Sequence, residues 1–326
     1  MTDVPGFSLG HFHDLDAFTG VTVILCPAET TAACELRGTA TATRGIDALR
    51  PEHLVGWPQH VVGYLDAIVF AGGSAFGLAA AGGVMQFLEE RGRGLFTGRY
   101  RVPAAAAAVI FDLNFGRGDV RPDEAMGRAA CEAATDREGP QGSIGAGTGA
   151  TVGKLLGMKR AMKGGLGTAS IILPGGGVVA AIAVVNAYGG VHNVESGEFL
   201  AGPRAEPPEE GFVDTSLYLR TKGRPFEGFS GTEGNTTLVA VATDVALTKT
   251  QTQKLAQMAA NGLILTVRPS YTTVDGDVAF ALSCGRRQAN LDEVGAAAQD
   301  TVARALRRSI VEANGFGLLP AHRDLR

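Results

Sequence analysis

Residues 234–237 read Gly-Asn-Thr-Thr and lie where two unlike segments meet, so the sequence could carry a nucleophile there. The preceding stretch, 201–234, is rich in Pro, Glu and Gly, whereas the residues that follow are mostly apolar. The hydroxyl of Thr236 could attack the carbonyl of Asn235, and hydrolysis of the resulting ester would leave Thr236 as a new N-terminus. Its α-amine, with an ordinary pKa of about 7.7–8.0, could then act as the base for its own hydroxyl. The alternative is a turn that begins a strand, which is the ordinary structure at such a junction.

Other common catalytic groups have no comparable arrangement. The cysteines are scattered without CxxC spacing, which favours reduced, buried thiols over a zinc site or a redox pair: Cys26, Cys34, Cys131 and Cys284. His11 and His13 could bind a metal, but no partner cluster follows them. No histidine stands in a Ser or Cys motif, as a conventional triad would require. We therefore expect no metal, no cofactor, and a nucleophile that works without histidine.

Glycine is abundant, at 46 residues, and it gathers in clusters between apolar runs. The cluster at 142–154, GSIGAGTGATVGK, ends in Gly-Lys as a phosphate-binding loop does. However, Leu155 follows Lys154 where that motif requires Ser or Thr, and the cluster does not match GxGxxG either. Tight turns between strands and helices explain these clusters better than a nucleotide site. Taken alone, Lys154 would be a solvated charge.

The elements that must position these residues alternate between strands and helices. Apolar and β-branched runs predict strands over 20–25, 66–70, 107–113, 169–173, 178–186, 237–243, 263–267 and 278–283. Helical spacing predicts helices that end near Gly92 and that span 122–134, 248–260 and 289–314. Thr248 is the expected N-cap of the third helix and Gly262 its C-cap residue. Residues 201–234 have no sustained period and predict a long exposed or mobile connection. The whole pattern indicates a layered sheet-and-helix protein.

Composition excludes several classes of protein. Of 326 residues, 45% are hydrophobic and 19% charged, as in globular proteins, and the net charge of −4 does not favour a nucleic-acid partner. The longest apolar run, 103–111, is shorter than the ~20 residues that span a bilayer, so no membrane partner is expected. The first residues lack a basic flank and an apolar stretch, so we expect no signal peptide and a cytoplasmic location.

Several blocks of the sequence occur together, and in this order, in one known family. They include DAIVFAGGSAFGLAAAGGV, VIFDLNFGRGDVRPDEAMGRAA, GAGTGATVGK, VVNAYGG, GNTTLVAVATD and VDGD. On these blocks the chain resembles, over nearly its full length, the DmpA-type L-aminopeptidase/D-esterase peptidases, which include β-aminopeptidases and nylon-oligomer (6-aminohexanoate) hydrolases. The resemblance implies an α/β fold, a four-layer αββα sandwich, in a single self-processing N-terminal-nucleophile hydrolase domain. It further implies that the chain, 1–326, is cut into 1–235 and 236–326.

The resemblance also implies roles for individual residues. Many family members carry Ser at the nucleophile position, and the Thr of GNTT is more similar to the nylon-oligomer hydrolases, so Asn235–Thr236 is the implied scissile bond. Lys154 matches the family lysine near the nucleophile, which leaves Lys159 and Lys163 as neighbours whose loss should have a mild effect. Asn186 matches the amide that stabilises the oxyanion, although alone it would be typical of a turn.

Two further features bear on the substrate. Asp275 and Asp277 match an acidic pair of the nylon-oligomer hydrolases, where β-aminopeptidases have Ser and Glu, and such a pair would attract a substrate's ammonium group. Taken alone, Asp-Gly-Asp is typical of a hairpin turn. Phe76 stands in a substrate-binding stretch where the nylon-oligomer hydrolases have Tyr, so a phenol hydroxyl is missing here.

The function expected from these features is hydrolysis of amide bonds in short peptides or amide oligomers, nylon-type 6-aminohexanoate oligomers included. The resemblance further implies a homotetramer. One alternative is an acyl transferase similar to ornithine acetyltransferases, which have a Thr nucleophile and transfer the acyl group to an amine. Another is a binding protein that has lost activity. The GAGTGATVGK and VIFDL blocks favour the hydrolase.

Overall fold

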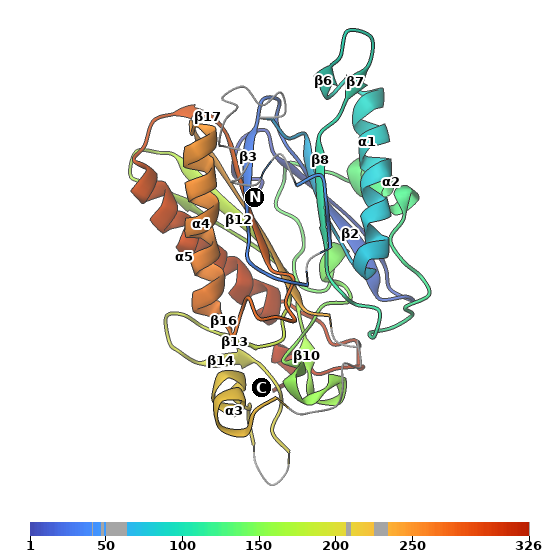
Figure 1. Cartoon of the computed structure of the whole chain (residues 1–326), viewed down its shortest axis with the longest axis vertical. Helices are drawn as coiled ribbons and strands as arrows, with labels where there is room; N and C mark the ends of the chain where they lie inside the picture. Colours follow the sequence, from blue (N-terminus) through green and yellow to red (C-terminus); the bar gives the residue numbers. More distant parts are fainter. Residues whose placement is uncertain (41, 47–48, 50–63, 207–209, 225–233, 326) are drawn as a thin grey trace.

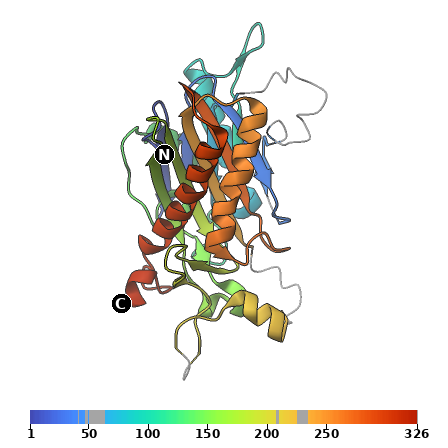
Figure 2. The same ribbon diagram turned by 90° about the vertical axis from the view of Figure 1, so that its left-hand side faces the viewer.

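Two five-stranded sheets lie face to face, and helices cover the outer side of each (Figure 1, and from the side in Figure 2). The computed structural model describes residues 1–40, 42–46, 49, 64–206, 210–224 and 234–325. This arrangement of helices, sheet, sheet and helices confirms the expected αββα sandwich.

The first sheet is built from the N-terminal part of the chain. Its order is β1 (Ser8–Asp14), β2 (Thr19–Leu25), β5 (Ala67–Ala71), β8 (Ala105–Val109) and β4 (Thr43–Arg44). β5 and β8 run parallel, and the other neighbours are antiparallel. Helices α1 (Ala80–Glu90) and α2 (Glu124–Glu132) pack on the outside of this sheet, and a 3-10 helix, Ser74–Ala79, leads from β5 into α1.

The second sheet carries the candidate nucleophile. Its order is β11 (Gly165–Ile172), β12 (Val178–Asn186), β15 (Thr236–Val245), β17 (Val278–Arg287) and β3 (Thr31–Leu36). β15 pairs antiparallel with β12 and parallel with β17. The long helices α4 (Lys249–Thr266) and α5 (Leu291–Val311) cover its outer face (Figure 2).

Smaller elements gather below the second sheet, in the lower part of Figure 1. They are β9 (Thr151–Val152) with β10 (Met162–Lys163), and the three-stranded group β13 (Gly190–His192), β14 (Phe199–Ala201) and β16 (Val267–Arg268). The β6 (Leu95–Phe96) and β7 (Arg101–Val102) hairpin projects at the opposite end.

Burial on both faces explains why the central strands read as continuous apolar runs. In β12, Ala180, Ile182 and Val184 face the core between the two sheets, whereas Ala181 and Ala183 face the helices. Strands covered on both sides have no polar face, so strict alternation is absent from their sequence. Among the described residues, no helix is both long and apolar enough to cross a membrane.

The predicted end of the third helix is wrong. Thr248 is its N-cap, with a capping box to Gln251, as the sequence indicated. The helix then continues through Gly262 to Thr266 and takes up most of the strand expected at 263–267. A Cβ at Gly262 would lie 2.3 Å from the backbone oxygen of Gln299 in α5. This glycine therefore allows two helices to approach closely and does not end one.

The connection at 201–234, expected to be irregular, contains a helix. Its described part contains α3 (Thr215–Lys222), with Asp214 as the N-cap that accepts from the backbone N–H of Leu217. Residues 207–209 and 225–233 of this connection lie outside the described residues. β1 and β3 were not predicted, because their polar residues hide the strand pattern.

Lys163 is a fully buried lysine on the short strand β10. Its Nζ donates to three backbone carbonyls, those of Gly147 at 3.1 Å, Ala150 at 2.7 Å and Gly164 at 2.9 Å. Burial lowers its pKa to about 7, and the nearby Asp112 carboxyl opposes that shift. Lys163 therefore ties together, through its Nζ, the glycine-rich segment before Lys154 and its own strand, and we call this set of three hydrogen bonds the cross-link. Its loss should not be mild, contrary to the expectation from the sequence.

We predict that Lys163→Ala lowers the free energy of unfolding by about 3 kcal/mol, because the three hydrogen bonds from its Nζ to buried carbonyls are lost. Lys159→Ala is the matched control, since Lys159 is exposed, and should change stability by less than about 0.5 kcal/mol. Urea unfolding of both variants measures the difference. Equal stability of the Lys163 variant and the parent chain would contradict the cross-link.

Candidate active site

Strand pairing brings three distant parts of the chain to one end of the second sheet. Thr236, the first residue of β15, pairs with Asn186, the last residue of β12. On the other side, the register that pairs Leu238 with Val278 in β15 and β17 continues to an isolated parallel bridge between Asn235 and Asp275. GNTT, VVN and VDGD, far apart in sequence, therefore meet at the same point.

Thr236 is buried, at 4% exposure, with its hydroxyl directed at the preceding peptide. Its Oγ1 donates to the carbonyl oxygen of Asn235 at 2.5 Å. The same oxygen accepts the backbone N–H of Gly276 at 2.7 Å. The candidate scissile carbonyl is thus polarised by two donors, one of which is the hydroxyl that would attack it.

Lys154 lies beside this bond and is buried, at 2% exposure, so the alternative of a solvated charge does not hold. It begins a 3-10 helix after Gly153, whose φ of 73° is left-handed and whose added Cβ would lie 2.2 Å from the Gly202 backbone. The Lys154 Nζ donates to Asn186 Oδ1 at 2.9 Å and to the Asn186 carbonyl at 3.1 Å, and it lies 3.4 Å from the Gly234 carbonyl. The Lys154 ammonium group therefore lies beside the carbonyl of Gly234, the residue that precedes the candidate scissile bond between Asn235 and Thr236.

Asn186 is fully buried and uses both ends of its side-chain amide. Oδ1 accepts from Lys154 Nζ and from the backbone N–H of Thr151 at 3.0 Å, and Nδ2 donates to the carbonyls of Phe111 at 3.1 Å and Gly234 at 3.2 Å. These partners fix which end carries the oxygen. In the uncut chain, the two amide N–H groups contact Gly234 and Phe111.

Asp275 and Asp277 are both buried and are bound to backbone N–H groups. Asp277 accepts from Thr237 at 2.6 Å and from Tyr271 at 2.9 Å. Burial, and then the neighbouring Asp275 carboxyl, raises the pKa of Asp277 to about 7. Asp275 accepts from the backbone N–H of Thr272 at 3.1 Å and from its hydroxyl at 2.5 Å, and burial raises its pKa.

The Asp-Gly-Asp segment is therefore not a hairpin turn, because the strand before it, β16, and the strand after it, β17, belong to different sheets. Both carboxylates lie inside the uncut chain, each about 1% exposed. Asp277 holds the backbone next to the Asn235–Thr236 bond through Thr237, and Asp275 holds Thr272, so neither is placed to attract an ammonium group from solvent in the uncut chain. The pairing of β15 with β17 brings both residues close to Thr236.

Phe76 lies in the 3-10 helix after β5 and is 57% exposed. The Arg121 guanidinium lies 3.7 Å from the centre of its ring. Its loop is linked to the site through Asp112, whose carboxylate accepts the backbone N–H of Gly73 at 2.6 Å and which directly follows Phe111. Phe76 thus lies in the connection between β5 and α1, and the hydrogen bond from Gly73 to Asp112 joins this connection to the segment that contains Phe111.

Three backbone groups of the site were not predicted from the sequence: the Gly276 N–H, the Thr151 N–H and the Phe111 carbonyl. Phe111, Asp112, Thr151, Lys154 and Gly234 help line a cavity of about 10 Å³ beside the scissile segment. This is about the volume that one water molecule requires. The DGD turn motif was the only sequence signal for Gly276.

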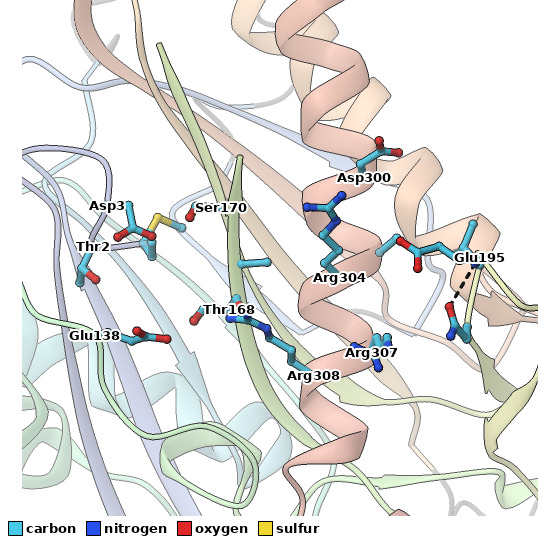
Figure 3. Close-up of a pocket in the computed structure, with 15 residues that line it drawn as sticks. Thr2, Asp3, Glu138, Thr168, Ser170, Glu195, Asp300, Arg304, Arg307 and Arg308 are labelled. Atoms are coloured by element: carbon cyan, nitrogen blue, oxygen red, sulfur yellow. Dashed lines mark hydrogen bonds between the residues drawn. The ribbon is translucent and has the colours of Figure 1, made fainter. Parts of the chain in front are cut away.

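A larger pocket, of about 460 Å³, lies elsewhere (Figure 3). In Figure 3, Arg304, Arg307 and Arg308 of α5 stand on one side of it, and Asp3 and Glu138 stand on the other. Its lining includes none of the candidate catalytic residues. Among the described residues, no group of three or more His, Cys, Asp or Glu side chains could hold a metal ion.

The groups around Thr236 are of the kinds that acyl transfer through a hydroxyl uses. They comprise a hydroxyl in contact with a carbonyl, a buried ammonium group, a fixed amide and two carboxyls of raised pKa. Such a set can form an ester from an amide and hydrolyse it with water.

Comparisons with known proteins agree with this chemistry. An uncharacterized aminopeptidase of Mycobacterium leprae is 37% identical over 361 aligned positions, which cover 99% of this chain and 92% of that protein. The 6-aminohexanoate-oligomer endohydrolase of Kocuria sp. is 31% identical over 290 aligned positions, covering 86% of this chain and 74% of that protein. These names favour hydrolysis over the acyl transfer considered as an alternative.

Solved structures are similar in fold. The L-aminopeptidase D-Ala-esterase/amidase of Ochrobactrum anthropi, described as a variant of the Ntn hydrolase fold, superposes with a TM-score of 0.70 at 18% identity, over 99% of this chain and 91% of that one. A β-aminopeptidase of Burkholderia sp. gives a TM-score of 0.65 at 23% identity, over 96% of this chain and 86% of that one. Residues 1–319 also match Peptidase family S58 as a whole. The chain therefore belongs to Peptidase family S58.

Proposed function

We propose that the chain is a self-processing amide hydrolase that first cuts its own Asn235–Thr236 bond and then uses Thr236 as nucleophile on other amides. The observation that carries this proposal is the 2.5 Å contact between the Thr236 hydroxyl and the Asn235 carbonyl. Membership of a peptidase family supports the same chemistry. The expected pieces are 1–235 and 236–326.

In the self-cleavage step, Thr236 Oγ1 forms a bond to the Asn235 carbonyl carbon and the bond from that carbon to the Thr236 nitrogen breaks. The hydroxyl proton passes to the nitrogen, so an ester and a free amine result. Water then hydrolyses the ester and leaves the Asn235 carboxylate and the Thr236 hydroxyl. Lys154 and Asn186 contact the Gly234 carbonyl and so hold the peptide in place for attack.

In turnover, the freed α-amine of Thr236 acts as base for its own hydroxyl. The Lys154 ammonium group nearby favours the neutral form of this amine and stabilises an alkoxide. When the segment that ends at Asn235 withdraws, the Asn186 amide loses its Gly234 partner and becomes available to a substrate oxyanion. A donor of this kind contributes about 3 kcal/mol to transition-state stabilisation. Asp277 holds the start of β15 through the Thr237 N–H.

The substrate we propose is a short amide with a free amine. Proteins similar to this chain are named as an aminopeptidase, a β-aminopeptidase and a 6-aminohexanoate-oligomer endohydrolase, and these names support a peptide or amide-oligomer substrate. The exposed Phe76, which has no phenol hydroxyl, favours simple aminoacyl amides over nylon oligomers.

We also propose a homotetramer in the cytoplasm, with no nucleic-acid or membrane partner. Sedimentation of the purified protein tests the oligomeric state.

We predict that the purified chain consists of two pieces of roughly 24 and 9 kDa, the smaller with 91 residues and N-terminal Thr236. Both should co-elute, because the smaller piece supplies β15 and β17 of the second sheet. Thr236→Ala should remain whole, since no nucleophile is left, and Thr237→Ala, the neighbouring control, should still be cut. Intact mass and N-terminal sequencing measure both. Cleavage of the Thr236 variant at the same bond would exclude Thr236.

Lys154→Met keeps the length of the side chain and removes its charge, so we predict at least a tenfold loss in the rate of self-cleavage, about 1.4 kcal/mol. The cause is the loss of a cation beside the Gly234 carbonyl and the Asn186 amide. Lys159→Met, on the exposed surface nearby, is the control and should cut within twofold of the parent rate. Equal slowing by both substitutions would indicate a general effect of positive charge.

For substrates, we predict that N-acetylation of an aminoacyl p-nitroanilide lowers kcat/KM at least tenfold, about 1.4 kcal/mol of transition-state binding. The amine partner is expected to appear only after self-cleavage, because Asp275 and Asp277 are buried in the uncut chain. A 6-aminohexanoate oligomer should be cleaved more slowly than the free aminoacyl amide. Equal rates with and without the acetyl group would rule out recognition of the amine.

A further inference from the structure

We propose that the backbone N–H of Gly276 is the oxyanion donor for self-cleavage at Asn235–Thr236. This inference rests on the proposed function and adds a catalytic group to it. The donor lies 2.7 Å from the Asn235 carbonyl oxygen, on which negative charge develops when Oγ1 attacks the carbonyl carbon. That distance is within the range at which oxyanion donors act.

The second donor to that oxygen is the Thr236 hydroxyl itself, and it cannot remain one. As Oγ1 bonds to the carbon, its proton leaves, and its hydrogen bond to the Asn235 oxygen ends. The Gly276 N–H keeps its position through this change. Two hydrogen bonds to the Asn235 carbonyl oxygen are described, and of these the one from the Gly276 N–H persists in the transition state.

The residues on either side hold the Gly276 amide in place. The backbone N–H of Ala40 donates to the Asp275 carbonyl at 3.0 Å, and the Asp277 carboxylate accepts the N–H groups of Thr237 and Tyr271. The amide is thus fixed before the reaction starts, and a donor that need not reorganise stabilises charge most effectively. This gives the buried Asp277 a role: together with the Ala40 N–H, it holds the peptide group that carries the Gly276 donor.

Glycine is required at this position because the nucleophile lies against it. A Cβ on residue 276 would stand 2.8 Å from Thr236 Oγ1 and 2.9 Å from the Ala40 carbonyl oxygen. Contacts this short are not tolerated unless something moves. A larger residue would displace the attacking hydroxyl from the carbonyl.

The side-chain amide of Asn186 contacts a different carbonyl from the one that Thr236 attacks. Its Nδ2 donates to the carbonyls of Gly234 and Phe111. In self-cleavage, Asn186 therefore positions the preceding peptide, and Gly276 stabilises the charge on the scissile carbonyl. The two groups act on adjacent peptides.

The test replaces the Gly276 amide by an ester. Cell-free translation with a tRNA charged with glycolic acid at codon 276 exchanges the N–H for an oxygen and adds no side chain. The matched control places glycolic acid at codon 176, which removes the Gly176 N–H bonded to the Leu173 carbonyl at 2.8 Å in the turn between β11 and β12 and keeps the Gly276 donor. Labelled methionine follows the appearance of both pieces with time, since Met258 lies in the smaller one. Resistance to added protease monitors folding.

We expect the ester at 276 to slow self-cleavage at least 100-fold, and the ester at 176 to slow it less than fivefold. Equal rates for the 276 ester and the parent chain, or equal slowing by both esters, would overturn the proposal. A parent chain that is never cut would instead refute the proposed function. If the 276 ester is protease-sensitive, Gly276→Ala decides: cleavage at the parental rate would show that residue 276 does not lie against the nucleophile, and would overturn the proposal too.

Discussion

The pairing of β15 with β12 on one side and β17 on the other determines where Asn186 and the Asp-Gly-Asp segment lie relative to Thr236. The antiparallel ladder places Asn186 opposite Thr236, and the parallel ladder extends to Asn235 and Asp275. A slip of one residue in either ladder would turn each side chain to the other face of the sheet. The apolar residues of β15, buried on both faces, prevent such a slip, because the core between the sheets and the core under α4 and α5 must both be filled.

The same strand pairing buries several charged and polar side chains, which destabilises the fold unless they are hydrogen-bonded. Backbone carbonyls and N–H groups of the site supply those hydrogen bonds. Lys154, Lys163 and Asn186 are buried with carbonyl partners, and the two aspartates are buried with N–H partners. Burial raises the pKa of Asp277 to about 7 and lowers that of Lys163 to about 7, so both groups titrate near neutral pH. Because the partners are mostly main-chain atoms, the site depends on glycine-rich segments that bring the backbone close.

The sequence predicted those parts of the fold that depend on local pattern. The strand at 178–186 has the bounds expected, and Thr248 caps its helix, because apolar runs and capping residues act over a few positions. Gly262 was misread, since whether a glycine ends a helix or lets another helix approach depends on tertiary contacts. Lys163 could not be told from Lys159 for the same reason. The resemblance located the residues around Thr236, but the Gly276 N–H and the Phe111 carbonyl are backbone groups, and backbone groups carry no residue type to recognise.

In the proposed mechanism, the substrate's acyl group becomes attached to the Thr236 hydroxyl during turnover. The direct measurement is rapid-quench mass spectrometry of the enzyme mixed with an activated ester of an amino acid, followed by peptide mapping. We expect one acyl group on the 91-residue piece, located at its first residue, Thr236, and formed and lost at the rate of turnover. An adduct on the 1–235 piece, or on another residue of the smaller piece, would contradict it.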